Sequence, residues 1–178
     1  MQRAHAIAAT AALVLCAIAV PTRATAAAAE SPIVAKVVER FHDGKPRRVE
    51  HYRDDVLLDV THYYPAGQPQ HMLAYTNDPR VGEVTTFWED GTRRGTYRLV
   101  DGIVVGARSV YNDKGVMTGQ LPHVAGKVHG LEKRFNADGK VIITSEWRDG
   151  GRHGWFRTWY VTGEKESEIL YREGVPAK

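Results

Sequence analysis

The sequence predicts an all-β protein built from tandem β-hairpins, and three observations lead to this fold class. Glycines and aromatic residues recur every 24 residues. Short segments alternate apolar and polar residues, and no segment after residue 40 carries a sustained apolar stripe of helical period. The connections are rich in Asp-Gly and Asn with glycine, which is typical of hairpins because glycine accepts a positive φ.

The first segment, residues 1–26, is predicted to be a secretory signal peptide. A basic start at Arg3 precedes an apolar run from Ala6 to Val20, and small residues follow Pro21. This run has 15 residues, fewer than the roughly 20 that span a bilayer, which favours cleavage over an uncleaved anchor. We expect cleavage after Ala26 or at one of the next three bonds, and export to the periplasm or the extracellular space.

Removal of the signal peptide changes the composition of the chain. The full sequence has 24 Lys and Arg against 21 Asp and Glu, a net charge of +3, and loss of Arg3 and Arg23 lowers this charge to +1. A charge this small gives no case for nucleic acid as a partner. The single cysteine, Cys16, is lost as well, so the fold must be held by packing and backbone pairing without disulfides.

After a linker at residues 27–37, residues 38–178 are predicted to form one repeat domain. Units of 24 residues are expected at 58–81, 82–105, 106–129, 130–153 and 154–177, with a degenerate unit at about 34–57. Three glycine columns and two aromatic columns support this division. The columns are Gly82, Gly106, Gly130, Gly154; Gly67, Gly91, Gly115, Gly139, Gly163; Gly102, Gly126, Gly150, Gly174; Tyr63, Phe87, Tyr111, Phe135, Trp159; and Tyr75, Leu99, His123, Trp147, Tyr171.

Each unit is expected to contain two short strands joined by a turn. In the last unit, "WFRTWY" leads through "VTG" to "SEILY" and "REG". One hairpin alone is marginal in water, whereas stacked hairpins support one another, as in a solenoid. We therefore expect the glycines to turn the chain and the aromatic side chains to pack between neighbouring hairpins.

The repeat units resemble a known family. "FWEDGTRRGTY", "RFNADGK" and "EWRDGGRHGWFRTWYVTGE" resemble MORN repeats, in the variant found in bacterial YwqK-type antitoxin-like proteins. The pattern of an aromatic residue followed by two spaced glycines is met by Trp147, Gly150 and Gly154, and the resemblance covers about residues 58–178. It implies an elongated, twisted, single-layer antiparallel sheet that binds proteins or membranes. The 24-residue period and the secretory signal depart from the best-studied members.

The residues that carry chemistry do not form a catalytic or metal-binding pattern. His129 and His153 share a repeat phase, but two histidines make an incomplete zinc site, and His51, His62 and His71 form only a loose group. Ser109 lacks the Gly-x-Ser-x-Gly spacing of a nucleophile elbow. We expect no enzyme activity, no metal, no cofactor and no small-molecule substrate.

Carboxylates and basic residues are expected to be solvated. The alternation of Glu164, Glu166 and Glu168 with other residues is typical of the solvent-facing side of a strand. Basic residues cluster at 45–48 and 93–94, but acidic residues lie close to both clusters.

The surplus of aromatic residues is the better indication of function. Trp155, Phe156 and Tyr160 are nearly consecutive, and Trp88 and Tyr64 share the offset of Tyr160. Either another segment covers them or they form an exposed patch, and large exposed apolar patches mark interaction sites. We predict a protein-binding scaffold with these five residues as partner-binding candidates. The alternatives are an envelope immunity protein that inhibits a secreted toxin and a module that binds phospholipid at a membrane surface.

Overall fold

The computed structural model describes residues 30–177, and the predicted signal peptide, Cys16 and the predicted cleavage site lie outside them. Within this range every regular element is a β-strand, so no described helix is available to cross a membrane. The sheet lies in the unit that begins at Ser31.

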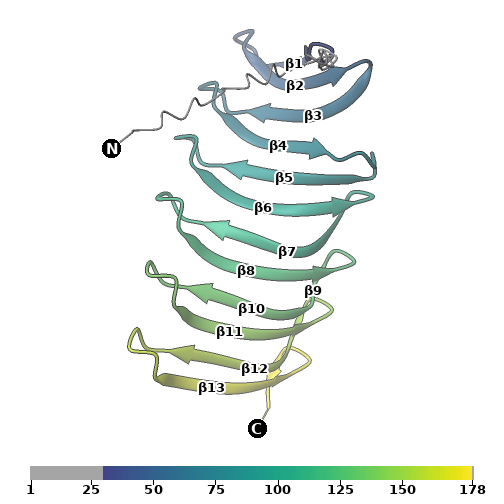
Figure 1. The fold of residues 1–178 in the computed structure, drawn as a ribbon. Coiled ribbons are helices and arrows are strands. Elements are labelled where there is room, and N and C mark those ends of the chain that lie inside the picture. Colours follow the sequence, from purple (N-terminus) through teal and green to yellow (C-terminus); the bar gives the residue numbers. More distant parts are fainter. Residues whose placement is uncertain (1–29, 178) are drawn as a thin grey trace, which may run out of the picture. The chain divides into compact units, whose positions relative to one another are not determined.

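The strands form one antiparallel sheet of 14 strands in which successive strands lie side by side (Figure 1). Only β9 departs from the sequential order, pairing with β8 just before the chain enters β10. The bounds are β1 Val34–Arg40, β2 Pro46–Arg53, β3 Val56–Tyr63, β4 Pro69–Tyr75, β5 Val81–Phe87, β6 Arg93–Val100, β7 Ile103–Tyr111, β8 Met117–Val124, β9 Lys127–Val128, β10 Gly130–Phe135, β11 Val141–Arg148, β12 Gly151–Trp159, β13 Lys165–Arg172 and β14 Val175–Pro176.

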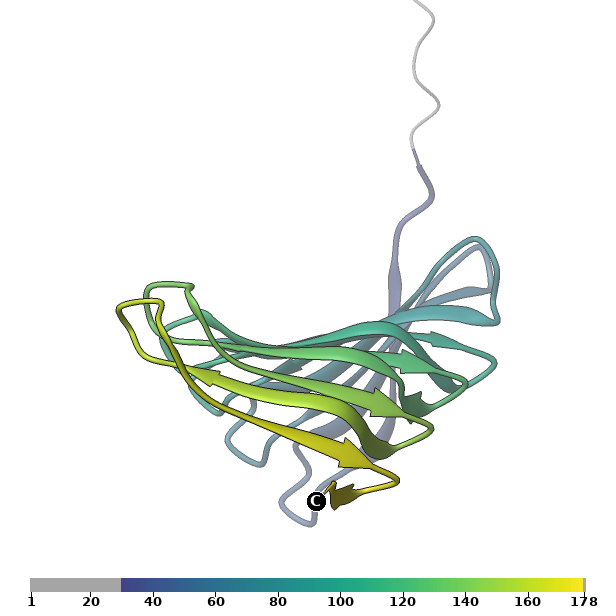
Figure 2. The ribbon, with the colours of Figure 1, turned by 90° about the horizontal axis from the view of Figure 1, so that it is seen from below.

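The predicted all-β array of hairpins in a single sheet is therefore confirmed. Each 24-residue unit contains one hairpin, and the degenerate unit at 34–57 is the hairpin of β1 and β2. The sheet begins at Val34, inside the segment 27–37 that the sequence analysis assigned to a linker. Figure 2 shows that the sheet twists and curves along its length.

Six wide turns connect the two strands of each unit along one edge of the sheet. In each turn the first residue donates its N–H to a carbonyl four residues on, and a glycine at positive φ donates back to that first residue. This is a type I turn closed by a glycine bulge, a favoured geometry for longer hairpin loops. The turns begin at Phe41, Tyr64, Trp88, Asn112, Asn136 and Tyr160.

Tight turns connect consecutive units along the opposite edge. Four of these turns pair a non-glycine residue with glycine, both at positive φ, as a two-residue type I′ turn requires. The first tight turn, Asp54–Asp55, has positive φ at both aspartates and no glycine. Between β4 and β5 the turn is longer and involves Thr76 to Arg80, without positive φ.

The glycine column that begins at Gly82 does not turn the chain, and its last three members bend it instead. Gly106, Gly130 and Gly154 have φ between +71° and +109° and lie six residues before a wide turn. At Gly106 the pairing advances by two residues on β6 and by four on β7, which is a bulge. Because of this bend, the residues that precede the glycine lie against the next tight turn.

Hydrogen bonds between successive tight turns join the units along this edge. Gly126 donates its N–H to the carbonyl of Val104, and the same bond recurs one unit later from Gly150 to Val128 and two units later from Gly174 to Arg152. These bonds are 2.9–3.0 Å long. The glycine columns thus connect units to one another as well as reversing the chain.

The register divides the side chains between two faces. Directly paired residues share a face, and one unbroken row of pairs crosses the sheet from Val37 in β1 to Glu168 in β13. This row defines the threonine face. Its members are Val37, Val49, Thr61, Met72, Thr85, Thr96, Ser109, Gln120, Lys133, Thr144, Arg157 and Glu168.

The opposite surface is called the groove face and is defined by the paired residues Val60, Leu73, Val84 and Tyr97. By strand alternation the column that contains Tyr63 lies on the threonine face, and the column that contains Tyr75 lies on the groove face. The two aromatic columns therefore pack on opposite sides of one layer.

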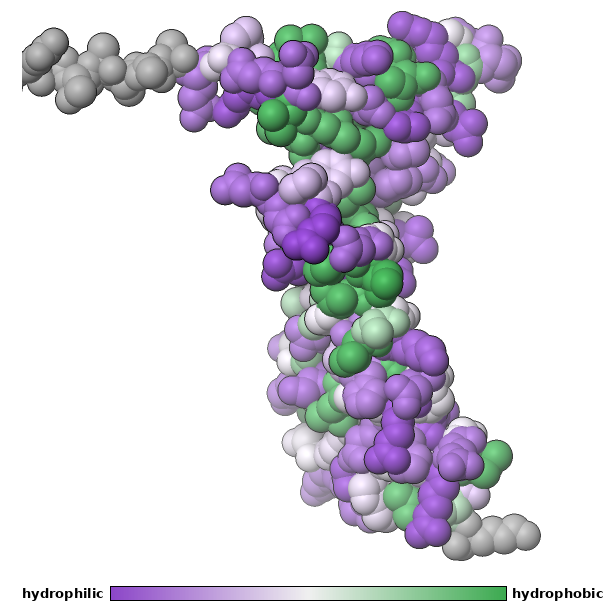
Figure 3. Space-filling view, turned by 90° about the vertical axis from the view of Figure 1, so that its right-hand side faces the viewer, coloured by the Kyte–Doolittle hydropathy of each residue, from purple (hydrophilic) through white to green (hydrophobic). Residues whose placement is uncertain are grey.

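The buried apolar core is small because no second layer covers the sheet in the part of the chain that the structure describes. Among the described residues the buried apolar side chains are Val49, Val60, Val81 and Val84, while the column aromatics are half-buried. Figure 3 looks onto the tight-turn edge and shows apolar residues in a line between polar flanks. Exposed apolar residues of the tight-turn segments include Val56, Ile103, Val124 and Val175.

Two glycines with similar backbone angles test how much the bulge depends on close packing. Gly154 has φ +107°, and a Cβ there would lie 2.9 Å from Cβ of Glu146, whereas Gly163 has φ +98° and open space around it. In both Gly→Ala variants the free energy of unfolding should fall by about 1–3 kcal/mol, because alanine disfavours a positive φ. In Gly154→Ala it should fall by at least about 1 kcal/mol more, because the new methyl group overlaps Glu146. Urea unfolding of both variants measures this, and equal losses would contradict the close packing of the bulge.

Candidate interaction surface

A shallow groove of about 310 Å³ lies on the groove face over β2 to β6. Its apolar part comes from side chains directly paired across four strands, and its basic part lies toward the wide-turn edge. The lining residues are Arg48, Val60, His62, His71, Leu73, Tyr75, Val84, Tyr97 and Leu99. A volume at the low end for ligand pockets, on an open sheet, suits protruding side chains of a partner better than an enclosed small molecule.

Two histidines stack at the basic end of the groove. His62 and His71 are directly paired across β3 and β4, and their rings lie 4.2 Å apart at an interplanar angle of 18°. Burial lowers the pKa of His62, and the neighbouring Arg48 guanidinium lowers it further. Burial also lowers the pKa of His71, with a contribution from His62. Both rings therefore favour the neutral form.

Arg48 is held in place by carboxylates on both sides. Its guanidinium donates to Glu50, which also accepts a 2.6 Å hydrogen bond from the Tyr52 hydroxyl, and lies 3.3 Å from Glu39 of β1. The hydrogen bonds from Tyr52 and Arg48 keep the pKa of Glu50 below its ordinary value. The groove thus has an ion-paired arginine at one end and apolar side chains along its length.

Arginine side chains cover many of the aromatic rings on both faces. The guanidinium of Arg93 lies 4.1 Å from the ring centre of Tyr111, and that of Arg108 lies 5.6 Å from Tyr97. Such contacts are attractive because the ring face is electronegative. In a sheet without a second layer, these arginines partly replace the layer that is missing.

Arg152 makes the most extensive of these contacts. Its guanidinium lies 5.0 Å from the ring centre of Phe156, 5.5 Å from Tyr171 and 5.6 Å from Trp147. Phe156 and Tyr171 also meet edge to face, 6.4 Å apart. This group closes the C-terminal end of the groove face.

A buried carboxylate lies between the groove and this aromatic group. Glu132 is 2 % exposed and accepts hydrogen bonds of 2.8 Å from Arg134 Nε and from Trp147 Nε1. Both carboxylate oxygens are therefore satisfied, which makes the burial of this charge tolerable. The middle of the groove face is polar as a result, so its apolar surface is split into two regions.

The five predicted partner-binding residues do not share one surface. Tyr64, Trp88 and Tyr160 are the first residues of three wide turns and lie along the wide-turn edge. The Tyr64 hydroxyl donates to the carbonyl of Phe87, and the Trp88 ring lies under Arg94 at 4.7 Å. Tyr160 is the most open of the three, at 52 % exposure.

Trp155 and Phe156 lie on opposite faces because adjacent residues of a strand point in opposite directions. Phe156 belongs to the groove face under Arg152, and Trp155 belongs to the threonine face under Arg157 at 5.1 Å. Both are half-buried and neither is an isolated exposed anchor. Strand alternation already implies that these consecutive aromatic residues cannot all lie on one face.

The remaining histidines occupy separate positions. His129 and His153 line one cavity of about 490 Å³ beside Trp155, and His129 lies 3.4 Å from Asp149. On the threonine face, His51 lies 2.7 Å from Asp59, which also accepts from Thr61. Within residues 30–177 no group of three or more His, Cys, Asp or Glu side chains is arranged to hold a metal ion.

The alternating glutamates of the last unit are exposed, and Glu168 pairs with Lys165 at 2.7 Å and with Arg157 at 3.4 Å. The groove itself was not predicted from the sequence. Val60, Val84 and Phe156 do recur every 24 residues, but Arg108 and Glu132 interrupt that column.

Comparison with known proteins adds little to this geometry. No family model and no curated protein matches the sequence. Among solved structures, a crystal structure of TarM is similar over 66 % of this chain and 21 % of that chain, with 10 % identity and a TM-score of 0.37. This likeness is too low to support a conclusion about function. The resemblance to MORN repeats stays a prediction.

The stacked histidines predict a loss of stability in acid. Because the pKa values of His62 and His71 lie below 6.5 in the folded protein, the unfolded chain binds protons first as the pH falls. The free energy of unfolding should therefore decrease between about pH 8 and about pH 5. Urea unfolding across this range checks the direction, and a His62→Gln, His71→Gln double variant should show a smaller dependence. If the double variant kept the same pH dependence, His62 and His71 would not be the cause of it.

The position of Arg152 predicts a larger stabilising role than that of other ring-covering arginines. Arg152→Gln should lower the free energy of unfolding by about 1–2 kcal/mol, since three ring contacts are lost. The matched variant Arg108→Gln loses one contact and should cost about 0.5 kcal/mol. Denaturant unfolding of the two variants compares them, and equal losses would show that the three rings add nothing.

Proposed function

We propose that this protein is an exported, non-catalytic scaffold that binds another protein through its groove face. The observation that carries the proposal is the groove over β2 to β6, where apolar side chains from neighbouring strands form a continuous uncovered surface with Arg48 at one end. Uncovered apolar grooves rimmed by polar groups are characteristic of interaction sites.

The chemistry of the groove selects a class of partner. Leu73, Leu99 and the tyrosine rings favour apolar side chains. At the wide-turn end Arg48 is already paired with Glu50 and Glu39, and the two histidines favour the neutral form. We therefore expect a protein segment that presents apolar residues beside a polar, hydrogen-bonding one. An immunity protein that inhibits a secreted toxin would use the same surface, so that alternative is a special case of the same binding mode.

Two matched tyrosines test the proposal. Tyr97 lies on the groove face under Arg108, and Tyr111 lies on the threonine face under Arg93. The purified protein is used to capture partners from an envelope extract. We expect Tyr97→Ala to weaken binding of the captured protein by about 30-fold or more, as for a central interface residue. Tyr111→Ala should leave binding unchanged.

The other outcomes have definite meanings. Equal effects of the two variants would place the interface elsewhere, and the adjacent pair Trp155→Ala and Phe156→Ala would then report which face is used. Salt-sensitive sedimentation with anionic vesicles, together with no captured protein, would replace the proposal with binding at a membrane surface. Thermal unfolding by circular dichroism confirms that each variant is folded.

A further inference from the structure

The two end strands of the sheet have unpaired edges that differ in shape. β1 pairs with β2 on one side, and among residues 30–177 no strand pairs with its other side. β13 is covered by β14 only at Tyr171 and Arg172, with a further bond from Ala177 N–H to the Leu170 carbonyl. The stretch from Lys165 to Ile169 has no outer strand in the described part of the chain. Such edges are templates for strand addition.

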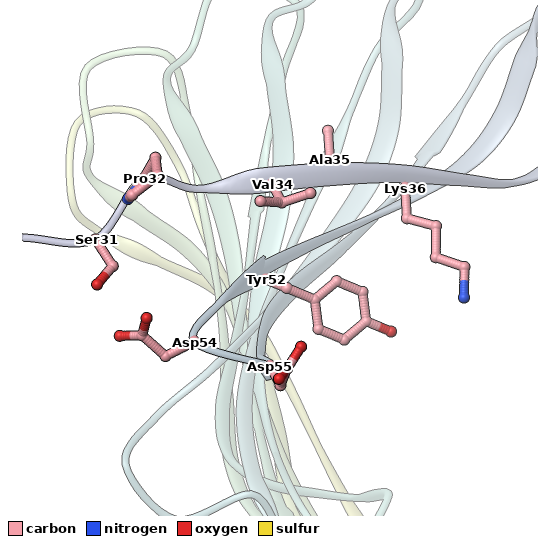
Figure 4. Close-up of a pocket in the computed structure, with 8 residues that line it drawn as sticks. All are labelled: Ser31, Pro32, Val34, Ala35, Lys36, Tyr52, Asp54 and Asp55. Carbon is pink, nitrogen blue, oxygen red and sulfur yellow. The ribbon is translucent and has the colours of Figure 1, made fainter.

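The first three repeats lack a bent segment that the last three repeats contain. In those repeats the residues after a tight turn bend at a bulge glycine and accept a hydrogen bond from the next tight turn, as Val104 does from Gly126. In the first repeat the residue six positions before the wide turn is Ala35, and its φ is not positive. β1 therefore runs straight past the tight turn Asp54–Asp55 (Figure 4).

A pocket of about 660 Å³ lies where that segment would be. Val34, Lys36 and Tyr52 line it from the strands, and Asp54 and Asp55 line it from the tight turn (Figure 4). Within residues 30–177 no backbone hydrogen bond joins this turn to another segment, whereas four of the five later turns bond backward to the preceding unit.

The opposite end of the sheet has the segment, but within residues 30–177 no further repeat receives it. β14 follows the tight turn Glu173–Gly174 as Ile103 follows Asp101–Gly102. Ile169 in β13 is 39 % exposed, whereas Ser145, its equivalent one repeat earlier, is 1 % exposed beneath its neighbouring strands. The last repeat is thus open where an additional hairpin would cover it.

The charges of the two edges are opposite. β1 carries Lys36, Glu39 and Arg40, a net charge of +1. The uncovered stretch of β13 carries Lys165, Glu166 and Glu168, a net charge of −1. Strand addition between two identical edges would instead place like net charges together, so the pairing of unlike edges is favoured.

We propose that copies of this chain associate head to tail, with β1 of one copy adding to β13 of the next. In this arrangement residues 175–177 of one copy enter the pocket beside Asp54 and Asp55 of the other and accept the turn-to-turn hydrogen bond seen in the interior repeats. The repeat then continues across the junction with the same antiparallel sense. Because the two contact surfaces differ, the association does not close after two copies and extends into a longer array.

Variants that block one edge each provide the test. Val37→Glu in β1 adds negative charge opposite a negative edge, and Ile169→Lys in β13 adds positive charge opposite a positive one. Sedimentation velocity should show a concentration-dependent series of species for the unmodified protein and monomers for each variant alone. An equimolar mixture of the two variants should form one-to-one dimers, because each retains the edge that the other lacks.

Controls separate assembly from loss of folding. Ile103→Lys alters an exposed apolar residue in the interior of the array and should keep the full series of species. If Val37→Glu or Ile169→Lys unfolds in circular dichroism, the exposed charge reversals Lys36→Glu and Glu166→Lys form a second pair. An unmodified protein that stays monomeric up to its solubility limit overturns the proposal. So does an Ile169→Lys variant that still dimerises, since that result means that β1 pairs with β1.

Discussion

The structure depends on one constraint: a single layer of sheet must stabilise itself without a second layer to pack against. Most domains bury one face of a sheet under helices or another sheet. Here the buried apolar side chains among the described residues are four valines, so each hairpin depends on the hydrogen-bond ladder and on side-chain rows shared with its neighbours. Each hairpin is therefore stabilised mainly by contacts with the hairpins next to it. Because the turns set the register of these contacts, they matter as much for stability as the side chains do.

The side chains respond to that constraint in two ways. Small hydroxyl residues form a row on one face, where cross-strand packing of β-branched side chains suits an exposed sheet. Larger rings lie on both faces and are covered by long arginine side chains from the same or neighbouring strands. Arg152 and Arg157 illustrate this arrangement, since each guanidinium lies over a ring while the side chain stays only half-buried. A substantial aromatic content is therefore compatible with a one-layer protein.

The repeat period made the hairpin array predictable, because a turn position with positive φ favours glycine regardless of the neighbouring residues. The start of the sheet at Val34 and the bulge at Gly106 were less accessible, since they depend on how neighbouring strands are paired. The opposite placement of Trp155 and Phe156 followed from strand alternation alone. The groove could not be predicted, because it joins residues from five strands whose register includes several bulges.

The two faces and the two ends of the sheet have distinct chemical characters, and this limits how the protein can act. A partner on the groove face meets apolar side chains near a fixed arginine, while a partner on the other face meets hydroxyls and mixed charge. The ends differ because the first repeat, like the two after it, lacks a positive-φ glycine before its wide turn, and because the last described repeat is followed by only a short strand. An array of this kind grows without covering its groove face, since strand addition uses edges and leaves both faces open. Binding and association are therefore separable, and an extended array would present the same groove once in every copy.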